Sequence, residues 1–177
     1  AAMVFSTPIA VNTTKADAAT VPNTSVITGT AWWDGPNENS GTYSVNVGET
    51  VDLYVTHVSG SKGLVFEANS DGNYFDCNLQ GALDVWGALQ TANNVEKADG
   101  YELPENAKIS VTRTEGNQLS FTVVDRDAED TTPVATVTAT LTLADDAAFD
   151  FYLMATDGSF RVSPYDYAVV TEKKSIT

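Results

Sequence analysis

The chain has little of the side-chain chemistry on which many protein sites depend. Its 177 residues include one cysteine, Cys77, and one histidine, His57. A single cysteine cannot form an intrachain disulfide bond. Having only one of each residue also excludes most zinc sites and leaves at most one histidine-dependent catalytic triad.

Basic residues are scarce as well. Nine Lys and Arg stand against 24 Asp and Glu, which gives a formal net charge of −15 and a pI near 4.1. Such a surface repels phosphate backbones and anionic lipids, so we expect neither nucleic acid nor a membrane as a partner. It does not disfavour a neutral ligand such as a polysaccharide, or a cation such as calcium.

Long apolar runs are also missing, since none approaches the roughly 20 residues that span a bilayer. Abundant Asp, Thr, Asn, Val and Gly with scarce lysine are typical of extracellular β-rich modules. We therefore expect a secreted protein, either extracellular or on a bacterial cell surface. Residues 1–19 have two interpretations: the tail of a signal peptide with an Ala-x-Ala cleavage site, or an ordinary first strand and linker.

Strand periodicity dominates what is present. Apolar and polar side chains alternate along residues 51–58, and the clearest hairpin joins residues 108–114 to residues 119–124. Residues 90–98 are the one stretch with helical character. We expect turns at residues 59–63, 69–73 and 156–159, which are rich in Gly, Ser, Asn and Asp. Further strands are expected at residues 25–33, 43–47, 64–68, 74–79, 81–89, 134–143, 149–153, 160–162 and 167–171.

Short strands at this spacing, without helices between them, predict an all-β protein. The expected fold is an antiparallel two-sheet β-sandwich or jelly roll with at most one short helix. A chain of this length suits one domain, which we assign to residues 24–171. Residues 1–23 would be an N-terminal strand, linker or processed segment, and residues 172–177 a polar tail. We expect a monomer.

Catalytic motifs are absent. The chain has no G-x-S-x-G, H-E-x-x-H or phosphate-binding G-x-x-x-x-G-K-[ST] sequence. Jelly-roll glucanases carry acids as E-x-D-x-x-E on one strand, and the nearest pattern here is Asp145-Asp146 with Asp150, before an otherwise apolar strand. We therefore do not expect an enzyme.

One acidic loop leaves a structural calcium ion open, although no other cofactor is expected. Asp125, Asp127 and Glu129 alternate as oxygen ligands would in a loop that holds a hard cation. The loop lacks the glycine and the glutamate at the sixth and twelfth positions of an EF-hand. The alternative interpretation is an ordinary solvated acidic loop.

Aromatic residues beside amides and carboxylates form the remaining signal. Sugar rings stack their apolar C–H faces on indole and phenol rings, while their hydroxyls bind amides and carboxylates. Two segments have this mixture. One holds Trp32 and Trp33, and the other runs from Tyr74 to Trp86. The candidate ligand-binding residues are Trp33, Trp32, Trp86, Tyr74, Asp76, Asn78 and Gln80.

The paired tryptophans cannot share one face of a strand, because neighbouring side chains point to opposite faces. We expect Trp32 to anchor the core and Trp33 to face a ligand together with Trp86. Core packing is the alternative for each of these rings, since tryptophan is highly buried on average.

The order of motifs resembles secreted β-sandwich modules of gut polysaccharide-degrading bacteria. Gly-Thr-Ala-Trp-Trp-Asp-Gly at residues 29–35 precedes Tyr-Ser-Val-Asn-Val-Gly-Glu-Thr-Val-Asp-Leu at residues 43–53. Asp-Val-Trp-Gly at residues 84–87 and Tyr-Leu-Met-Ala-Thr-Asp-Gly-Ser-Phe at residues 152–160 follow. Residues 63–69 depart from the pattern, since they lack an Asn-Trp-rich stretch.

This resemblance implies a non-catalytic carbohydrate-binding module that stacks sugar on Trp33 or Trp32 and on Trp86. The expected ligand is a neutral, glucan-type plant or storage polysaccharide or oligosaccharide, and the expected partner is an attached or neighbouring glycoside hydrolase. The alternative is a structural or adhesive extracellular surface domain whose aromatic residues form the core.

Overall fold

The computed structural model describes residues 25–30, 35–115, 117–144 and 146–167. Within these ranges the regular structure is entirely β, and no helix long and apolar enough to cross a membrane occurs. The strands are β1 (Ser25–Gly29), β2 (Tyr43–Val45), β3 (Thr50–Ser70), β4 (Asn73–Asn78), β5 (Val85–Trp86), β6 (Gln90–Lys97), β7 (Asn106–Glu115), β8 (Gln118–Asp125), β9 (Ala135–Leu141) and β10 (Phe149–Ser163).

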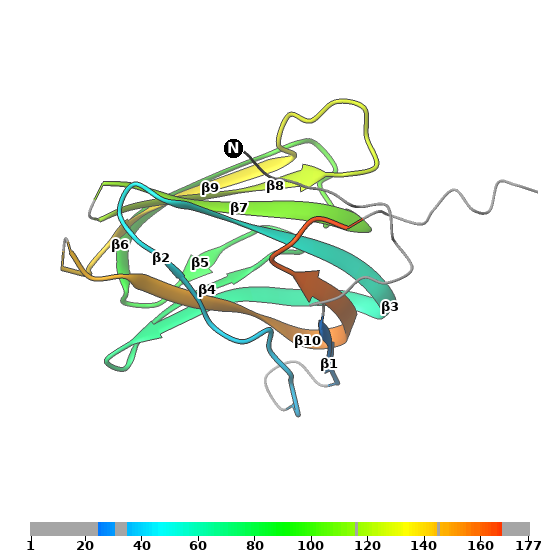
Figure 1. Ribbon diagram of the computed structural model, residues 1–177, viewed down its shortest axis with the longest axis horizontal. Coiled ribbons are helices and arrows are strands. Elements are labelled where there is room, and N and C mark those ends of the chain that lie inside the picture. The colour runs from blue at the N-terminus through cyan, green and yellow to red at the C-terminus, as the bar shows by residue number, and fades with distance from the viewer. Residues whose placement is uncertain (1–24, 31–34, 116, 145, 168–177) are drawn as a thin grey trace, which may run out of the picture.

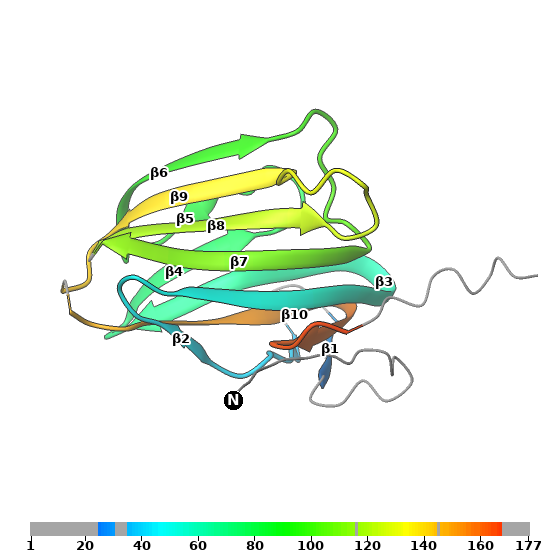
Figure 2. The same cartoon turned by 45° about the horizontal axis from the view of Figure 1, so that its top comes forward.

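The strands form one antiparallel hydrogen-bonded sheet in the order β1-β10-β3-β7-β8-β9-β6. Strand β2 also pairs with β10, and β4 lies between β3 and β5. Figures 1 and 2 show β7, β8 and β9 in one layer and β10, β4 and β5 in the layer that faces it. The antiparallel all-β prediction is confirmed. Because all ten strands share one hydrogen-bonded sheet, a division into two separate sheets remains a prediction.

Two long, bent strands connect the layers. The first half of β3 pairs with β7, and its second half pairs with β4. Strand β10 follows β3 along both halves, with register shifts between Ala155 and Phe160. At this point Gly158 has φ of +98°, and a Cβ there would lie 1.8 Å from the Ser61 carbonyl oxygen. Glycine is thus required where the two strands cross closely and bend.

Two predicted turns are therefore wrong. Residues 59–63 lie inside β3 and residues 156–159 lie inside β10, paired with each other through irregular register. Their Gly and Ser residues make bulges rather than chain reversals. His57 supports the bend, since its Nε2 lies 2.8 Å from the Gly60 carbonyl oxygen and its Nδ1 lies 3.1 Å from Glu105 Oε1.

The helical prediction for residues 90–98 is also wrong. This segment forms β6, which pairs with β9 from Gln90 to Lys97 and is the last strand of the sheet order. Its side chains are mostly exposed on both faces, as suits an edge strand. Residues 81–89, predicted as one strand, contain only the short β5. The predicted hairpin is confirmed, since β7 and β8 pair in register from Ala107 to Arg113.

The core lies between the layers and is built on phenylalanine. The Phe66 ring on β3 stacks on Phe121 of β8 at 4.6 Å between centroids and on Phe151 of β10 at 4.7 Å. Phe75 on β4 meets Phe66 edge-on at 5.7 Å. These contacts join strands from both layers, so they hold the folded-over sheet together.

A fully buried arginine closes one end of this core. Arg113 on β7 is 0 % exposed, and its Nη1 donates hydrogen bonds to the carbonyl oxygens of Val45 and Ala147. The guanidinium thereby ties β2 and the segment before β10 to β7. Its role is structural.

Candidate functional site

The candidate site lies on the outer face of β4 and β5. Phe75, Cys77 and Leu79 are fully buried and face the core, so alternation turns the residues between them outward. In β5, Val85 is buried while Trp86 is exposed. The Cα of Asp76 pairs with that of Trp86. The outward residues of this part of the sheet are Tyr74, Asp76, Asn78, Gln80 and Trp86.

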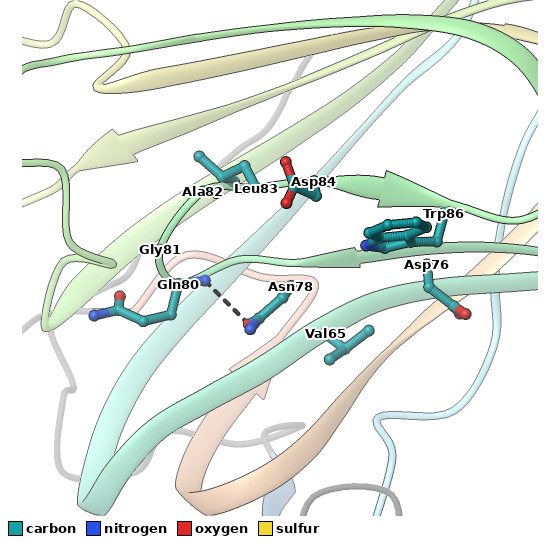
Figure 3. Close-up of a pocket in the computed structure, with 9 residues that line it drawn as sticks. All are labelled: Val65, Asp76, Asn78, Gln80, Gly81, Ala82, Leu83, Asp84 and Trp86. Atoms are coloured by element: carbon teal, nitrogen blue, oxygen red, sulfur yellow. Dashed lines mark hydrogen bonds between the residues drawn. The ribbon is translucent and has the colours of Figure 1, made fainter.

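An open groove of about 580 Å³ occupies this face. That volume falls within the range of about 300–1,000 Å³ that is usual for small-ligand sites. Figure 3 shows Trp86 at one end of the groove and Gln80 at the other, with Asn78 between them. The groove is lined by Val65, Asp76, Asn78, Gln80, Gly81, Ala82, Leu83, Asp84 and Trp86.

Trp86 is the most unusual residue of the groove, because its side chain is 67 % exposed. Tryptophan is highly buried on average, so an indole this open requires an explanation. The next residue fixes its position. Gly87 has φ of +110°, and a Cβ there would lie 1.9 Å from the Tyr74 carbonyl oxygen. That same carbonyl accepts a hydrogen bond from the Leu89 N–H at 3.0 Å. The chain after Trp86 is thus pinned against β4, which sets the indole at the groove.

The loop between β4 and β5 carries local strain. Leu83 is a non-glycine residue with φ of +58°. Such a conformation costs about 1–3 kcal/mol and is enriched at functional sites. It is held by the fully buried Leu83 side chain and by a hydrogen bond of 3.4 Å from Cys77 Sγ to the Leu83 carbonyl oxygen. Burial first, then the charges of Asp84 and Asp76, raise the pKa of Cys77 to about 12. Cys77 therefore remains a neutral thiol that supports the loop.

Two amide side chains have their oxygen atoms bound within the protein. Asn78 Oδ1 accepts from the Gln80 N–H at 3.2 Å, and Gln80 Oε1 accepts from the Leu103 N–H at 2.6 Å. Among the described residues, none accepts a hydrogen bond from Asn78 Nδ2 or Gln80 Nε2. The amides are therefore held in place and can offer N–H donors to a ligand.

Asp76 belongs to a row of side chains in register across three neighbouring strands. Its Cα pairs with that of Glu67 on β3, which pairs with Tyr152 on β10. Glu67 is only 6 % exposed, and its Oε1 accepts from the Tyr152 hydroxyl at 2.7 Å. Burial, hydrogen bonding to Glu67 and the charge of Glu67 raise the pKa of Asp76 to about 7. Asp76 Oδ1 is buried without a hydrogen-bond partner in the described part of the chain. The groove thus contains an acid that is poised to gain or lose a proton and an acceptor that lacks a donor.

Four of the predicted site residues, Asp76, Asn78, Gln80 and Trp86, meet in the groove. Tyr74 is 47 % exposed on the same face of β4, but it is not part of the groove lining. Trp32 and Trp33 lie outside the described residues. The expectation that one faces a ligand and the other the core stays a prediction.

Five residues of the groove lining were not predicted, namely Val65, Gly81, Ala82, Leu83 and Asp84, and neither was Glu67 beside Asp76. Asp84 stands two residues before Trp86, so strand alternation could have placed it on the same face. Val65 and Glu67 reach the site through the pairing of β3 with β4. β3 and β4 form a hairpin around Asp71 and Gly72, both with positive φ, so the predicted turn at residues 69–73 could have indicated this pairing.

The acidic loop after β8 has partners within the protein. Asp125 Oδ1 accepts from the Asp127 N–H at 2.9 Å, and Asp127 Oδ2 accepts from Asn106 Nδ2 at 3.0 Å. Within the described ranges, no three His, Cys, Asp or Glu side chains are grouped so that they could hold a metal ion. The structure therefore does not gather Asp125, Asp127 and Glu129 into the predicted calcium site.

Comparison with known proteins adds little to this geometry. No protein-family model matches the chain, and no curated protein matches its sequence. One solved structure with some likeness is the CBM2 module of the evolved Dit protein of Lactobacillus casei BL23 phage J-1. It is 12 % identical, with 84 % of this chain and 94 % of that chain covered, at a TM-score of 0.25. A score this low carries no argument about fold or function, so the groove itself must support any assignment.

Proposed function

We propose that the chain is a non-catalytic carbohydrate-binding module that takes a neutral, glucan-type polysaccharide into the Trp86 groove. The exposed Trp86 indole carries the proposal. An open aromatic ring beside amide donors and carboxylate acceptors matches the two surfaces of a sugar, whose C–H face is apolar and whose edge carries hydroxyls. Folded over as a sandwich of the jelly-roll kind, the sheet would present this groove on a rigid outer face.

Each lining group has a role in this proposal. The indole stacks on one sugar ring. Asn78 Nδ2 and Gln80 Nε2 donate hydrogen bonds to hydroxyl oxygens, while Asp76 and Asp84 accept from hydroxyl groups. Tyr74, on the same face of β4, would extend the contact to a neighbouring sugar unit.

The biological role would be to concentrate an attached or partner glycoside hydrolase on polysaccharide outside the cell. Linking a binding module to an enzyme raises the effective concentration of substrate without any new contact at the enzyme. Shallow, hydrated sites give little net free energy, so the dissociation constant is expected to lie between about 1 µM and about 1 mM.

Affinity electrophoresis in gels that contain xyloglucan, β-glucan, mannan or starch tests the proposal. At least one polysaccharide should retard the protein, and Trp86→Ala should weaken the retardation at least about tenfold. Tyr165→Ala is the matched control, because Tyr165 is 61 % exposed and is not part of the groove lining. Equal retardation of wild type and Trp86→Ala by every polysaccharide would contradict the proposal, as would the absence of retardation.

A further inference from the structure

The groove has an excess of negative charge that a neutral sugar does not use. Its lining contains two carboxyl groups, Asp76 and Asp84, and no Lys or Arg. Glu67 adds a third carboxyl group directly beside Asp76. The whole chain carries a net charge of −15, which favours cations near its surface.

Asp76 meets the groove beside a second carboxyl group. Its Oδ1 is buried, so only the part of the side chain that lines the groove can meet a ligand. The hydrogen bond between Asp76 and Glu67 requires a proton on one of the two groups, and a charged donor on a ligand can replace that proton better than a neutral hydroxyl can. An ammonium group at this position would also offset the repulsion between Asp76 and Glu67.

The titratable groups beside Asp76 are carboxyl and phenol groups, including Tyr74, whereas Lys97 Nζ donates to the Gly81 carbonyl oxygen at 3.3 Å, at the Gln80 end of the groove (Figure 3). Strand β3 contributes Glu67, strand β10 contributes Tyr152, and the loop before β5 contributes Asp84. Burial first, then the hydrogen bond to Glu67, raise the pKa of the Tyr152 hydroxyl, so it stays neutral. The exposed Trp86 ring is a second attraction, since indole is the best aromatic partner for a cation.

We propose that the Trp86 groove selects amine-bearing sugars, with the ammonium group of a glucosamine-type unit held between the Asp76 carboxylate and the Trp86 indole. The inference rests on the proposed function, since it names the sugar class that the same groove prefers. The remaining hydroxyls of such a sugar bind Asn78, Gln80 and Asp84 as a neutral sugar would. Uronic acids and sulfated sugars are excluded by like charge.

Binding of an amine-bearing sugar should release a proton from the groove. The raised pKa of Asp76 means that the free groove holds a proton at about pH 6. An ammonium group favours the ionised carboxylate, so that proton leaves for the solvent when the amine binds. A neutral sugar requires no such release.

Three tetrasaccharides with the same β-1,4 linkage separate the possibilities, because they differ only at C2: a hydroxyl in the glucose tetramer, an acetamide in the N-acetylglucosamine tetramer and an amine in the glucosamine tetramer. Calorimetry at about pH 6, near physiological salt, in two buffers of different ionisation enthalpy measures both affinity and proton release. The glucosamine tetramer should bind at least about tenfold more tightly than the other two and release a proton.

Variants complete the test. Asp76→Asn should remove both the preference and the proton release, and Asp84→Asn should weaken the preference. Asp146→Asn deletes the same charge from an exposed loop residue outside the groove lining and should change neither. Equal or tighter binding of a neutral tetramer would overturn the inference and leave the proposed function standing. An amine preference that survives Asp76→Asn would also overturn it, because the attraction would then come from the whole acidic surface. If no tetramer binds, the inference fails, and affinity electrophoresis with xyloglucan, β-glucan, mannan and starch decides separately whether the proposed function stands.

Discussion

At the scale of single residues, Asp76 and Trp86 are the two exceptions to ordinary burial that define the groove. One is an aromatic residue that remains largely exposed, and the other is a carboxyl group packed against a second carboxyl group. Neither arrangement favours folding. Keeping both arrangements lowers the stability of the protein but provides groups that can bind a ligand. Strained or perturbed residues at functional sites often have this effect.

The free energy of unfolding should depend on pH through the protonation of Asp76. Its pKa is about 7 in the folded chain against an ordinary value of 3.8. Between these values the folded state holds a proton that the unfolded state has lost, so the free energy of unfolding falls as pH rises from about 4 to about 7 and then levels off. The free energy of unfolding can be measured with urea at about pH 5 and about pH 8. From the lower to the higher pH it should fall by about 1–2 kcal/mol more in wild type than in Asp76→Asn, after allowance for solvent screening.

Asp146→Asn serves as the control for this measurement and should keep the wild-type pH dependence. A decrease of the same size in Asp76→Asn and in wild type would show that Asp76 titrates as an ordinary carboxyl group. The raised pKa, and the proton release that we infer from it, would then be wrong.

At the scale of elements, the bend shared by β3 and β10 determines the shape of the molecule. It carries the second half of β3, with the β4 strand that pairs with it as a hairpin, from the layer of β7 to the layer that faces it. Gly158 makes this crossing possible, because its conformation and the nearby Ser61 carbonyl oxygen both exclude a side chain.

Gly158→Ala should therefore destabilise the fold by more than about 2 kcal/mol, through left-handed strain plus a backbone clash. Gly48→Ala is the matched control, since Gly48 also has positive φ but a Cβ there would meet nothing within 4 Å. Backbone strain alone should lower the free energy of unfolding of Gly48→Ala by about 1–2 kcal/mol. Thermal unfolding of both variants gives the comparison, and equal losses would show that the close crossing is not limiting.

Much of this element structure could be predicted from the sequence, and the failures have a common physical origin. Alternation placed Asp76 and Asn78 on one face, and the hairpin of β7 and β8 follows from its pattern. Residues 59–63 and 156–159 were predicted as turns because Gly and Ser favour turns and bulges alike. Which of the two forms depends on pairing between strands about 100 residues apart in the chain. Glu67, by contrast, pairs with Asp76 across the local β3–β4 hairpin, so the predicted turn at residues 69–73 could have indicated it.

At the scale of the whole molecule, charge is the dominant property. A net charge of −15 opposes the compact state through self-repulsion while it repels anionic partners. Few described ion pairs offset it, and the Lys108–Asp52 pair has a separation of 3.8 Å on a partly exposed surface. Such pairs contribute little to stability.

Screening should therefore stabilise the protein. Raising sodium chloride from about 0.02 M to about 0.3 M should increase the unfolding temperature by about 2–4 °C, since the Debye length falls below the spacing of many surface charges. Sodium chloride is preferable to sulfate, which strengthens apolar burial in any protein. An unfolding temperature that falls with sodium chloride would contradict net self-repulsion.

The central claim is that the groove beside Trp86 receives a sugar. A titration with the β-1,4-linked glucose and glucosamine tetramers, followed by two-dimensional ¹H–¹⁵N NMR, tests it most directly, with the Trp86 indole N–H assigned from its loss in Trp86→Phe. The predicted result is that the largest shifts fall on that indole, on the side-chain amides of Asn78 and Gln80, and on the backbone of residues 76–87. Saturating shifts elsewhere on the surface with none at Trp86, or no shifts with these tetramers or with mannan and starch oligosaccharides, would contradict the account.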